Sequence, residues 1–272
     1  MPAQTTVGRL LAREGRVVAW ALTLAVALAA AFTLSGGGTG MSAVQMTAAT
    51  GPLGALIAGT PDVIRPVSWT PGYAALILAM WWLMMVAMML PSAAPAVLLY
   101  GAVSPARGAR GSLGFLAGYL AIWAGFSALA TLVQGMLAAY GLISPMYMNL
   151  AAPGLGAIIL IGVGLYQLTR TKAACLVRCR GPVETLIRYR RVGRAAAFRM
   201  GLHHGAACLG CCWALMMLLF VGGVMNIWWI LAITLYVAAE KLAPWGHRLA
   251  RPAGGFLMLA GLALLAATIR PA

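Results

Sequence analysis

Long apolar runs, separated by short segments that hold most of the charge, dominate this 272-residue chain. Hydrophobic residues make up 62% of it and charged residues only 8%, against about a quarter in soluble domains. The runs approach the roughly 20 residues that cross a bilayer as a helix, so they predict membrane spans. We expect an all-α, polytopic bundle that forms one membrane domain over residues 1–272. The expected spans are 17–34, 73–100, 113–140, 153–169, 200–222, 226–239 and 253–269.

Positive charge predicts how the bundle is oriented. With a cytoplasmic N-terminus, the inside segments hold 17 Lys and Arg, and the outside segments hold only Arg65 and Arg270. Cytoplasmic segments of membrane proteins carry such an excess. The predicted cytoplasmic loop 170–199 contains nine of these cations, and orientation over anionic lipid explains them better than nucleic-acid binding. We therefore expect a multi-pass protein of the bacterial inner membrane, with a cleaved signal peptide as the alternative for the first run.

The fifth apolar run carries an unusual set of metal-binding side chains, in the sequence MGLHHGAACLGCCWALM (Met200–Met216). Residues three or four positions apart share one face of a helix. Thiolates, thioethers and imidazoles are soft or borderline ligands that suit Cu(I) or Zn. We predict a soft-metal site whose core ligands are Cys208, Cys211, Cys212 and His204, with Met216 one turn further on. Tight helix packing through small residues is the competing interpretation of the cysteines.

The second run is rich in methionine, with five of the chain's sixteen methionines between Met80 and Met89. Methionine also fills gaps in packed cores, which is the plainer interpretation of any single one. If the second and fifth runs are antiparallel helices, Met84 and Met88 lie at depths comparable with Cys212 and Cys208. We therefore expect thioethers of the second run to complete the shell, namely Met80, Met84, Met85 and Met88.

The remaining sulfur side chains divide by compartment. Cys175 and Cys179 fall in the basic loop, whereas the outward segments contain no cysteine. A thioether stays a competent soft ligand in an oxidising compartment where thiols form disulfides. The outward segments hold Met41, Met46, Met146, Met148 and Met225. We predict a relay in which Met146 and Met148 serve outside, and Cys175 and Cys179 pass metal to a carrier or a membrane cuproenzyme.

Several sequence blocks resemble a bacterial family of predicted metal-binding integral membrane proteins. They are MWWLMMVAMMLPS (Met80–Ser92), the Cys175 and Cys179 segment, GLHHGAACLGCCWALM (Gly201–Met216), GVMN (Gly223–Asn226) and EKLAPWG (Glu240–Gly246). The resemblance implies a helical membrane protein with a metal site in those blocks. The adjacent Cys211 and Cys212 are also similar to the paired cysteines of mercuric-ion transport proteins.

The leading hypothesis is a membrane protein that binds Cu(I), with Zn or Hg as alternatives, for transport or delivery. Two rivals remain: an accessory subunit of a membrane complex with a structural metal, and a membrane thiol–disulfide oxidoreductase. A disulfide between Cys211 and Cys212 would be strained by their short separation. No nucleotide-binding motif is present, no catalytic residue is predicted, and enzyme activity is not favoured. For Glu240, we expect an ion pair with an arginine of the basic loop.

Overall fold

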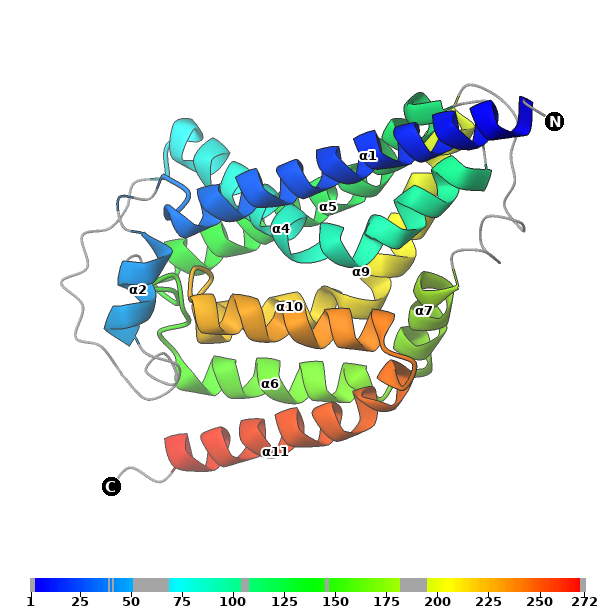
Figure 1. Ribbon diagram of the computed structural model, residues 1–272. Coiled ribbons are helices and arrows are strands. Elements are labelled where there is room, and N and C mark those ends of the chain that lie inside the picture. Colours follow the sequence, from blue (N-terminus) through cyan, green and yellow to red (C-terminus); the bar gives the residue numbers. More distant parts are fainter. Residues whose placement is uncertain are drawn as a thin grey trace.

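The computed structural model describes residues 3–38, 40, 42–50, 69–103, 108–144, 147–181 and 195–269. Within these ranges the chain is helical apart from one isolated bridge between Ile143 and Leu150, which confirms the all-α prediction for this part (Figure 1). The helices are α1 (Ala3–Leu34), α2 (Ala43–Thr50), α4 (Pro71–Val103), α5 (Gly108–Ala139), α6 (Pro153–Gln167), α7 (Arg170–Arg180), α9 (Ala196–Gly222), α10 (Ile227–Leu242), the 3-10 helix η2 (Gly246–Arg248) and α11 (Ala250–Ile269).

Five of the described helices are long and apolar enough to cross a membrane, and a sixth crossing results if α6 and α7 count as one broken span. The bend between those two helices is 63°. Seven spans are therefore not confirmed. The difference lies in α6 and α10, which have 15 and 16 residues. At 1.5 Å per residue each rises only about 24 Å, less than the roughly 30 Å of a hydrocarbon core. The orientation of the bundle stays a prediction.

Several segments outside the predicted spans contain helix. The basic loop 170–199 begins with α7, whose first turn is capped because the Thr169 hydroxyl accepts a bond from the Lys172 amide. Helix α9 starts at Ala196, before the predicted span. Helix α2 lies in the Gly- and Thr-rich segment after the first span, and α1 starts as early as Ala3. The expectation of a loop was therefore wrong for residues 170–180.

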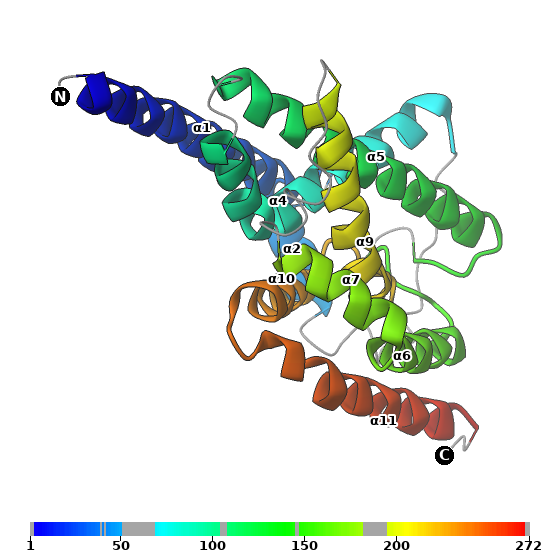
Figure 2. The same cartoon turned by 90° about the vertical axis from the view of Figure 1, so that its right-hand side faces the viewer.

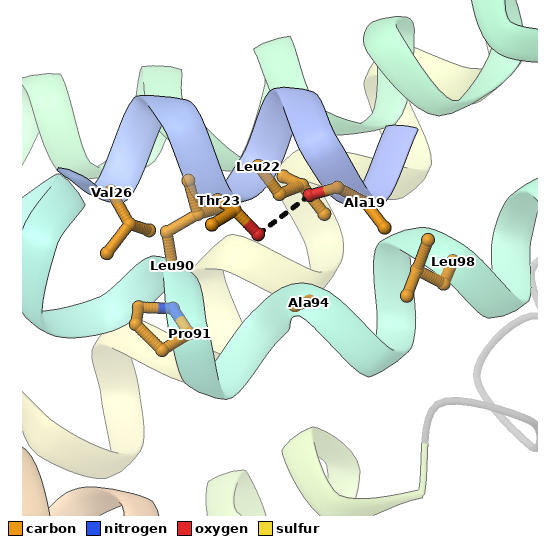
Figure 3. Close-up of a pocket in the computed structure, with 8 residues that line it drawn as sticks. All are labelled: Ala19, Leu22, Thr23, Val26, Leu90, Pro91, Ala94 and Leu98. Atoms are coloured by element: carbon orange, nitrogen blue, oxygen red, sulfur yellow. Dashed lines mark hydrogen bonds between the residues drawn. The ribbon is translucent and has the colours of Figure 1, made fainter. Parts of the chain in front are cut away.

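Helix α4 carries Pro91 and Pro95 in its interior and changes direction there, as expected from the loss of two backbone donors (Figure 1). Beside the bend, α1 and α4 line an open pocket of about 330 Å³ (Figure 3). Its lining includes Leu22, Val26, Leu90 and Leu98 and is almost wholly apolar. The pocket offers no soft-metal ligand, so the candidate site lies elsewhere.

Helix α9 is the interior helix of the bundle. Of its most apolar 18 residues, 72% lie buried, against 11% for the segment that contains α11. Glycines allow its close contact with α5: a Cβ on Gly201 would lie 1.9 Å from the Phe115 carbonyl oxygen, and one on Gly118 would lie 2.1 Å from the Phe198 carbonyl oxygen. Besides α5, helices α7 and α10 lie next to α9, each on a different side of it (Figures 1 and 2). The cysteine-bearing helix is thus enclosed by other elements rather than turned to the outside.

Candidate metal centre

Three cysteines of α9 form the centre of the site. Cys208, Cys211 and Cys212 are each only 1% exposed. The Cys211 and Cys212 thiols both donate to the Cys208 carbonyl oxygen, at 3.1 Å and 2.9 Å. Short polar side chains in helices often bond back to the preceding turn in this way. The back-bonding holds two thiols close to the Cys208 side of the helix and away from lipid.

Sulfur from α4 meets sulfur from α9 inside the bundle. The Met89 Sδ lies 3.9 Å from the Cys212 Sγ, and both residues are buried. Met89 belongs to the methionine-rich run but was not among the predicted ligands. A methionine of the second run and a cysteine of the fifth therefore lie together one turn beyond Met85, while the pairing expected for Met84 and Met88 stays a prediction. Because 123 residues separate this pair in the sequence, only the packing of the bundle brings them together.

A lysine from α10 points into the same cluster. The Lys241 Nζ lies 3.0 Å from the Cys208 Sγ, 3.8 Å from the Met89 Sδ and 3.4 Å from the Ser92 Oγ. Its side chain is 6% exposed, so this ammonium sits inside the protein. Lys241 was not predicted as part of the site; the one signal in the sequence is a charged pair at the end of an apolar run.

Tyr119 of α5 borders the site on another side. Its hydroxyl lies 3.1 Å from the Cys208 Sγ and donates a bond of 3.2 Å to the Met89 carbonyl oxygen. The residue is fully buried. One phenol therefore contacts both α4 and α9 at the level of the cluster. Nothing in the local sequence around Tyr119 indicates this role.

Helix α7 brings a fourth cysteine to the site. The half-buried Cys179 lies on the side of the site that α7 covers, as a neighbour of Cys208 and Cys211. Cys175, one turn earlier, packs against α9, where a Cβ on Gly210 would lie 2.7 Å from the Cys175 Sγ. Both cysteines were predicted in the basic loop, but they lie on helix α7, which packs against α9. Their part in a metal relay stays a prediction.

The other predicted site residues have varied surroundings. His204 is buried beside the rings of Phe115 and Tyr119, at centroid distances of 5.7 Å and 6.0 Å. Met80 lies at the other end of the methionine run: a Cβ on Gly37 would meet the Met80 Cγ at 2.8 Å and the Met225 Cε at 3.5 Å. Four further methionines are buried, and their part as ligands stays a prediction: Met84, Met85, Met88 and Met216.

The predicted outer methionines are only partly described. Met148 is buried in the turn between α5 and α6 and has a left-handed backbone, with φ of 52°. Its carbonyl oxygen accepts a 3.3 Å bond from the Val224 amide, which ties this turn to the end of α9. Met46 and Met225 are also buried. Met146 and Met41 lie outside the described residues.

A buried ion pair fixes α7 against α10 next to the cluster. The Lys172 Nζ donates to the Glu240 Oε1 at 2.5 Å, and both side chains are 1% exposed. The Tyr236 hydroxyl donates to the same oxygen at 2.7 Å, and Arg180 donates to the Ala243 carbonyl oxygen at 2.7 Å. Among the described residues, the Glu240 carboxylate pairs with a lysine rather than with the predicted arginine, and Arg180 binds backbone at the end of α10.

The side chains of this cluster offer mainly soft sulfur ligands and few oxygen ligands. In the part of the chain that the structure describes, no group of three or more His, Cys, Asp or Glu side chains is placed to hold a metal ion. Thioethers are not in that group of side chains, and Cu(I) is satisfied by two or three sulfur ligands. The pairing of Cys212 with Met89, beside Cys208, therefore suits Cu(I) better than a metal that needs four ligands.

Comparison with known proteins gives one match. Residues 78–264 match a family described as PpoB2, copper chaperone. The matched range runs from α4 into α11, so it contains every described residue of the cluster around Cys208. No curated protein and no solved structure gives a significant match.

Proposed function

The chain belongs to this copper chaperone family, and from that premise we propose that it binds Cu(I) within a bundle of membrane helices and delivers it to another copper protein. The proposed setting is the bacterial inner membrane, where a multi-pass bundle with this charge distribution would sit. The acceptor is a soluble metal carrier or a membrane cuproenzyme.

One observation carries the proposal: sulfur atoms from three helices meet in the bundle interior. Cys208 and Cys212 come from α9, Met89 from α4 and Cys179 from α7. Thiols and thioethers can pack together without a metal. Binding of copper would explain why several of them gather at one point. Soft sulfur ligands favour Cu(I) over hard cations such as Mg²⁺ or Ca²⁺. Zn and Hg are the alternatives that the same ligands can bind.

We assign the ligand roles by proximity. Cys208, Cys212 and Met89 are the inner ligands, and Cys211 and Cys179 are the thiols to which the ion moves next. His204 and the methionines Met80, Met84, Met85, Met88 and Met216 form the wider set. Cys175 lies at the far end of this series, on α7.

The position of α7 suggests how copper leaves. Cys179 and Cys175 are one turn apart and both half-buried, so they link the enclosed cluster to the surface of the bundle. Exchange of Cu(I) between neighbouring thiolates proceeds without ever releasing the free ion. A carrier that presents its own thiols to Cys175 would therefore receive the ion directly.

Metal analysis tests this function. Purified wild-type protein loaded under reducing conditions is expected to retain about one copper per chain, whereas a Cys208/Cys211/Cys212→Ser variant retains little. Serine is close to cysteine in size and can bond back to the preceding turn in the same way. Equal copper in the two proteins would contradict the proposal.

A second function is favoured by one contact. Cys179 approaches Cys208 and Cys211 from another helix, which gives a thiol–disulfide oxidoreductase a cysteine pair without the strain of adjacent residues. Thiol trapping in intact cells separates the two functions. A cycling disulfide that includes Cys179 supports the oxidoreductase, and thiols that stay reduced and shielded support the copper site.

A further inference from the structure

Lys241 is an unexpected component of a site for a cation. It is the penultimate residue of α10, and its ammonium reaches away from the helix end into the sulfur cluster. A positive charge next to metal ligands opposes metal binding, because two unit charges at close range repel strongly in a medium of low polarity. Its presence therefore needs an explanation.

Resting on the proposed function, we propose that the Lys241 ammonium occupies the place of the copper ion, that Cu(I) displaces it on loading, and that its return drives release. Lys241 is on this account a built-in competitor. It lowers the affinity of the site to a level at which a partner can take the ion.

The distances show where the ammonium and the copper ion would compete. The Lys241 Nζ touches the Cys208 Sγ at 3.0 Å and the Met89 Sδ at 3.8 Å, while that Sδ lies 3.9 Å from the Cys212 Sγ. The ammonium is thus in contact with two of the three inner ligands. A Cu(I) ion bound to the same sulfur atoms would overlap with the ammonium or lie directly beside it. Because the two positive charges repel each other, the site holds one of the two cations at a time.

The neighbouring charges do not account for the position of Lys241. Glu240, adjacent in the sequence, is engaged by Lys172 and by the Tyr236 hydroxyl on another side of α10. Among the described residues, the Lys241 ammonium contacts the sulfur atoms of Cys208 and Met89 and the Ser92 hydroxyl at 3.4 Å. Its contact at 3.0 Å with the Cys208 sulfur is therefore its main stabilising interaction, and this is the contact that a bound Cu(I) ion would replace.

The lysine also has the means to move. Its flexible four-carbon stem allows the ammonium to swing about the end of α10 toward more polar surroundings. With Cys208 as the one thiolate in both states, replacing the ammonium by Cu(I) exchanges one monovalent cation for another and leaves the charge of the cluster unchanged. A divalent ion would add a charge to the same enclosed space. Lys241 therefore favours Cu(I) over Zn(II).

Neutral substitutions of Lys241 test the inference. Lys241→Gln and Lys241→Leu are expected to bind Cu(I) roughly tenfold more tightly than wild type, in competition with a chromogenic Cu(I) chelator, and to release it correspondingly more slowly. Lys241→Arg keeps the charge and is expected to stay close to wild type. A purely structural lysine gives the opposite sign, since its loss loosens the site and weakens binding.

The outcomes separate this inference from the function on which it rests. If wild-type protein binds Cu(I) and neither neutral variant binds it more tightly, the role of Lys241 is overturned and the copper site stands. If wild-type protein binds no Cu(I), the proposed function fails first. Two neutral variants of different polarity are used, so that the test still gives a result if one of them misfolds.

Discussion

At the scale of single residues, Cys208 contacts groups from three helices. Its sulfur contacts Tyr119 and Lys241 at 3.1 Å and 3.0 Å, and its carbonyl oxygen accepts the thiols of Cys211 and Cys212. The residue thus joins the side chains of α5, α9 and α10 at one point. The proposed copper site is organised around it.

Met89 is the residue whose substitution tests the α4 side of the site. Met89→Leu keeps the volume of the side chain but removes the sulfur atom. We expect it to weaken Cu(I) binding roughly tenfold, about 1.4 kcal/mol, as measured by chelator competition. Met136→Leu is the matched control, because Met136 on α5 is 61% exposed and remote from the cysteines. Equal affinities in the two variants would exclude Met89 as a ligand.

The sequence pattern indicates two runs with sulfur-containing side chains, but it does not show which of those side chains meet. Cys208, Cys211 and Cys212 stand out as thiols in an apolar run, and the methionine-rich run indicates a sulfur-lined helix. The choice of Met89 over Met84 or Met88 depends on how α4 is rotated against α9, which no local pattern fixes. The contacts of Tyr119 and Lys241 join residues far apart in the sequence, so they too were missed.

At the scale of elements, the buried pair between Lys172 and Glu240 holds α7 in place. Arg180 strengthens this junction by donating to the Glu240 and Ala243 carbonyl oxygens, where the end of α10 attracts positive charge. Cys179 is on α7 and Lys241 is on α10, so the same junction positions two components of the cluster.

Glu240→Gln is expected to lower stability markedly, because it leaves the Lys172 ammonium buried without its counter-charge. Breaking such a pair costs roughly 3–5 kcal/mol. Thermal unfolding in detergent measures the loss. A Lys172→Met/Glu240→Gln double variant removes both charges and should recover much of it. If the double variant is no more stable than Glu240→Gln alone, the pair is not the source of the effect.

Cross-linking tests the docking of α7 on α9. In a protein that keeps only Cys179 and Cys208, a mild oxidant is expected to form an intramolecular disulfide rapidly, detected by the loss of free thiols. Adding Glu240→Gln to that background should slow the reaction, since α7 is held less firmly. Absence of the disulfide from both proteins would contradict the placement of Cys179.

The helices were easier to predict than the connections between them. Apolar runs produced the spans of α4, α5 and α9 to within a few residues, and the prolines marked the bend of α4. The segment 170–180 was taken for a loop because it is so basic. Two of its cations, on Lys172 and Arg180, instead bind partners more than 60 residues away. Such pairing cannot be detected in a local charge pattern.

At the scale of the whole molecule, the described part of the bundle combines five long apolar helices with two shorter ones, α6 and α10. Composition was sufficient to predict a helical membrane protein, because 62% hydrophobic residues leave few soluble folds open. The number of crossings depends on how far α6 and α10 extend in a bilayer. That property belongs to the protein and the lipid together.

Site-directed labelling tests the predicted orientation. In a cysteine-free background, a cysteine introduced within residues 182–194 is expected to react with an impermeant reagent only after the cells are opened. One introduced within residues 51–68 should react in cells whose outer membrane alone is permeable. The physical reason is the distribution of Lys and Arg, 17 to 2 between the two sides. The reverse pattern would invert the proposed direction of copper delivery.

The central claim is that sulfur from α9 and α4 holds one Cu(I) ion in the bundle interior. X-ray absorption at the copper edge of loaded protein tests it most directly, with Met89→Leu measured alongside. We predict a monovalent copper edge, a first shell of sulfur only, and one sulfur fewer in the variant. A first shell of nitrogen and oxygen, or a sulfur shell that Met89→Leu leaves unchanged, would contradict the claim.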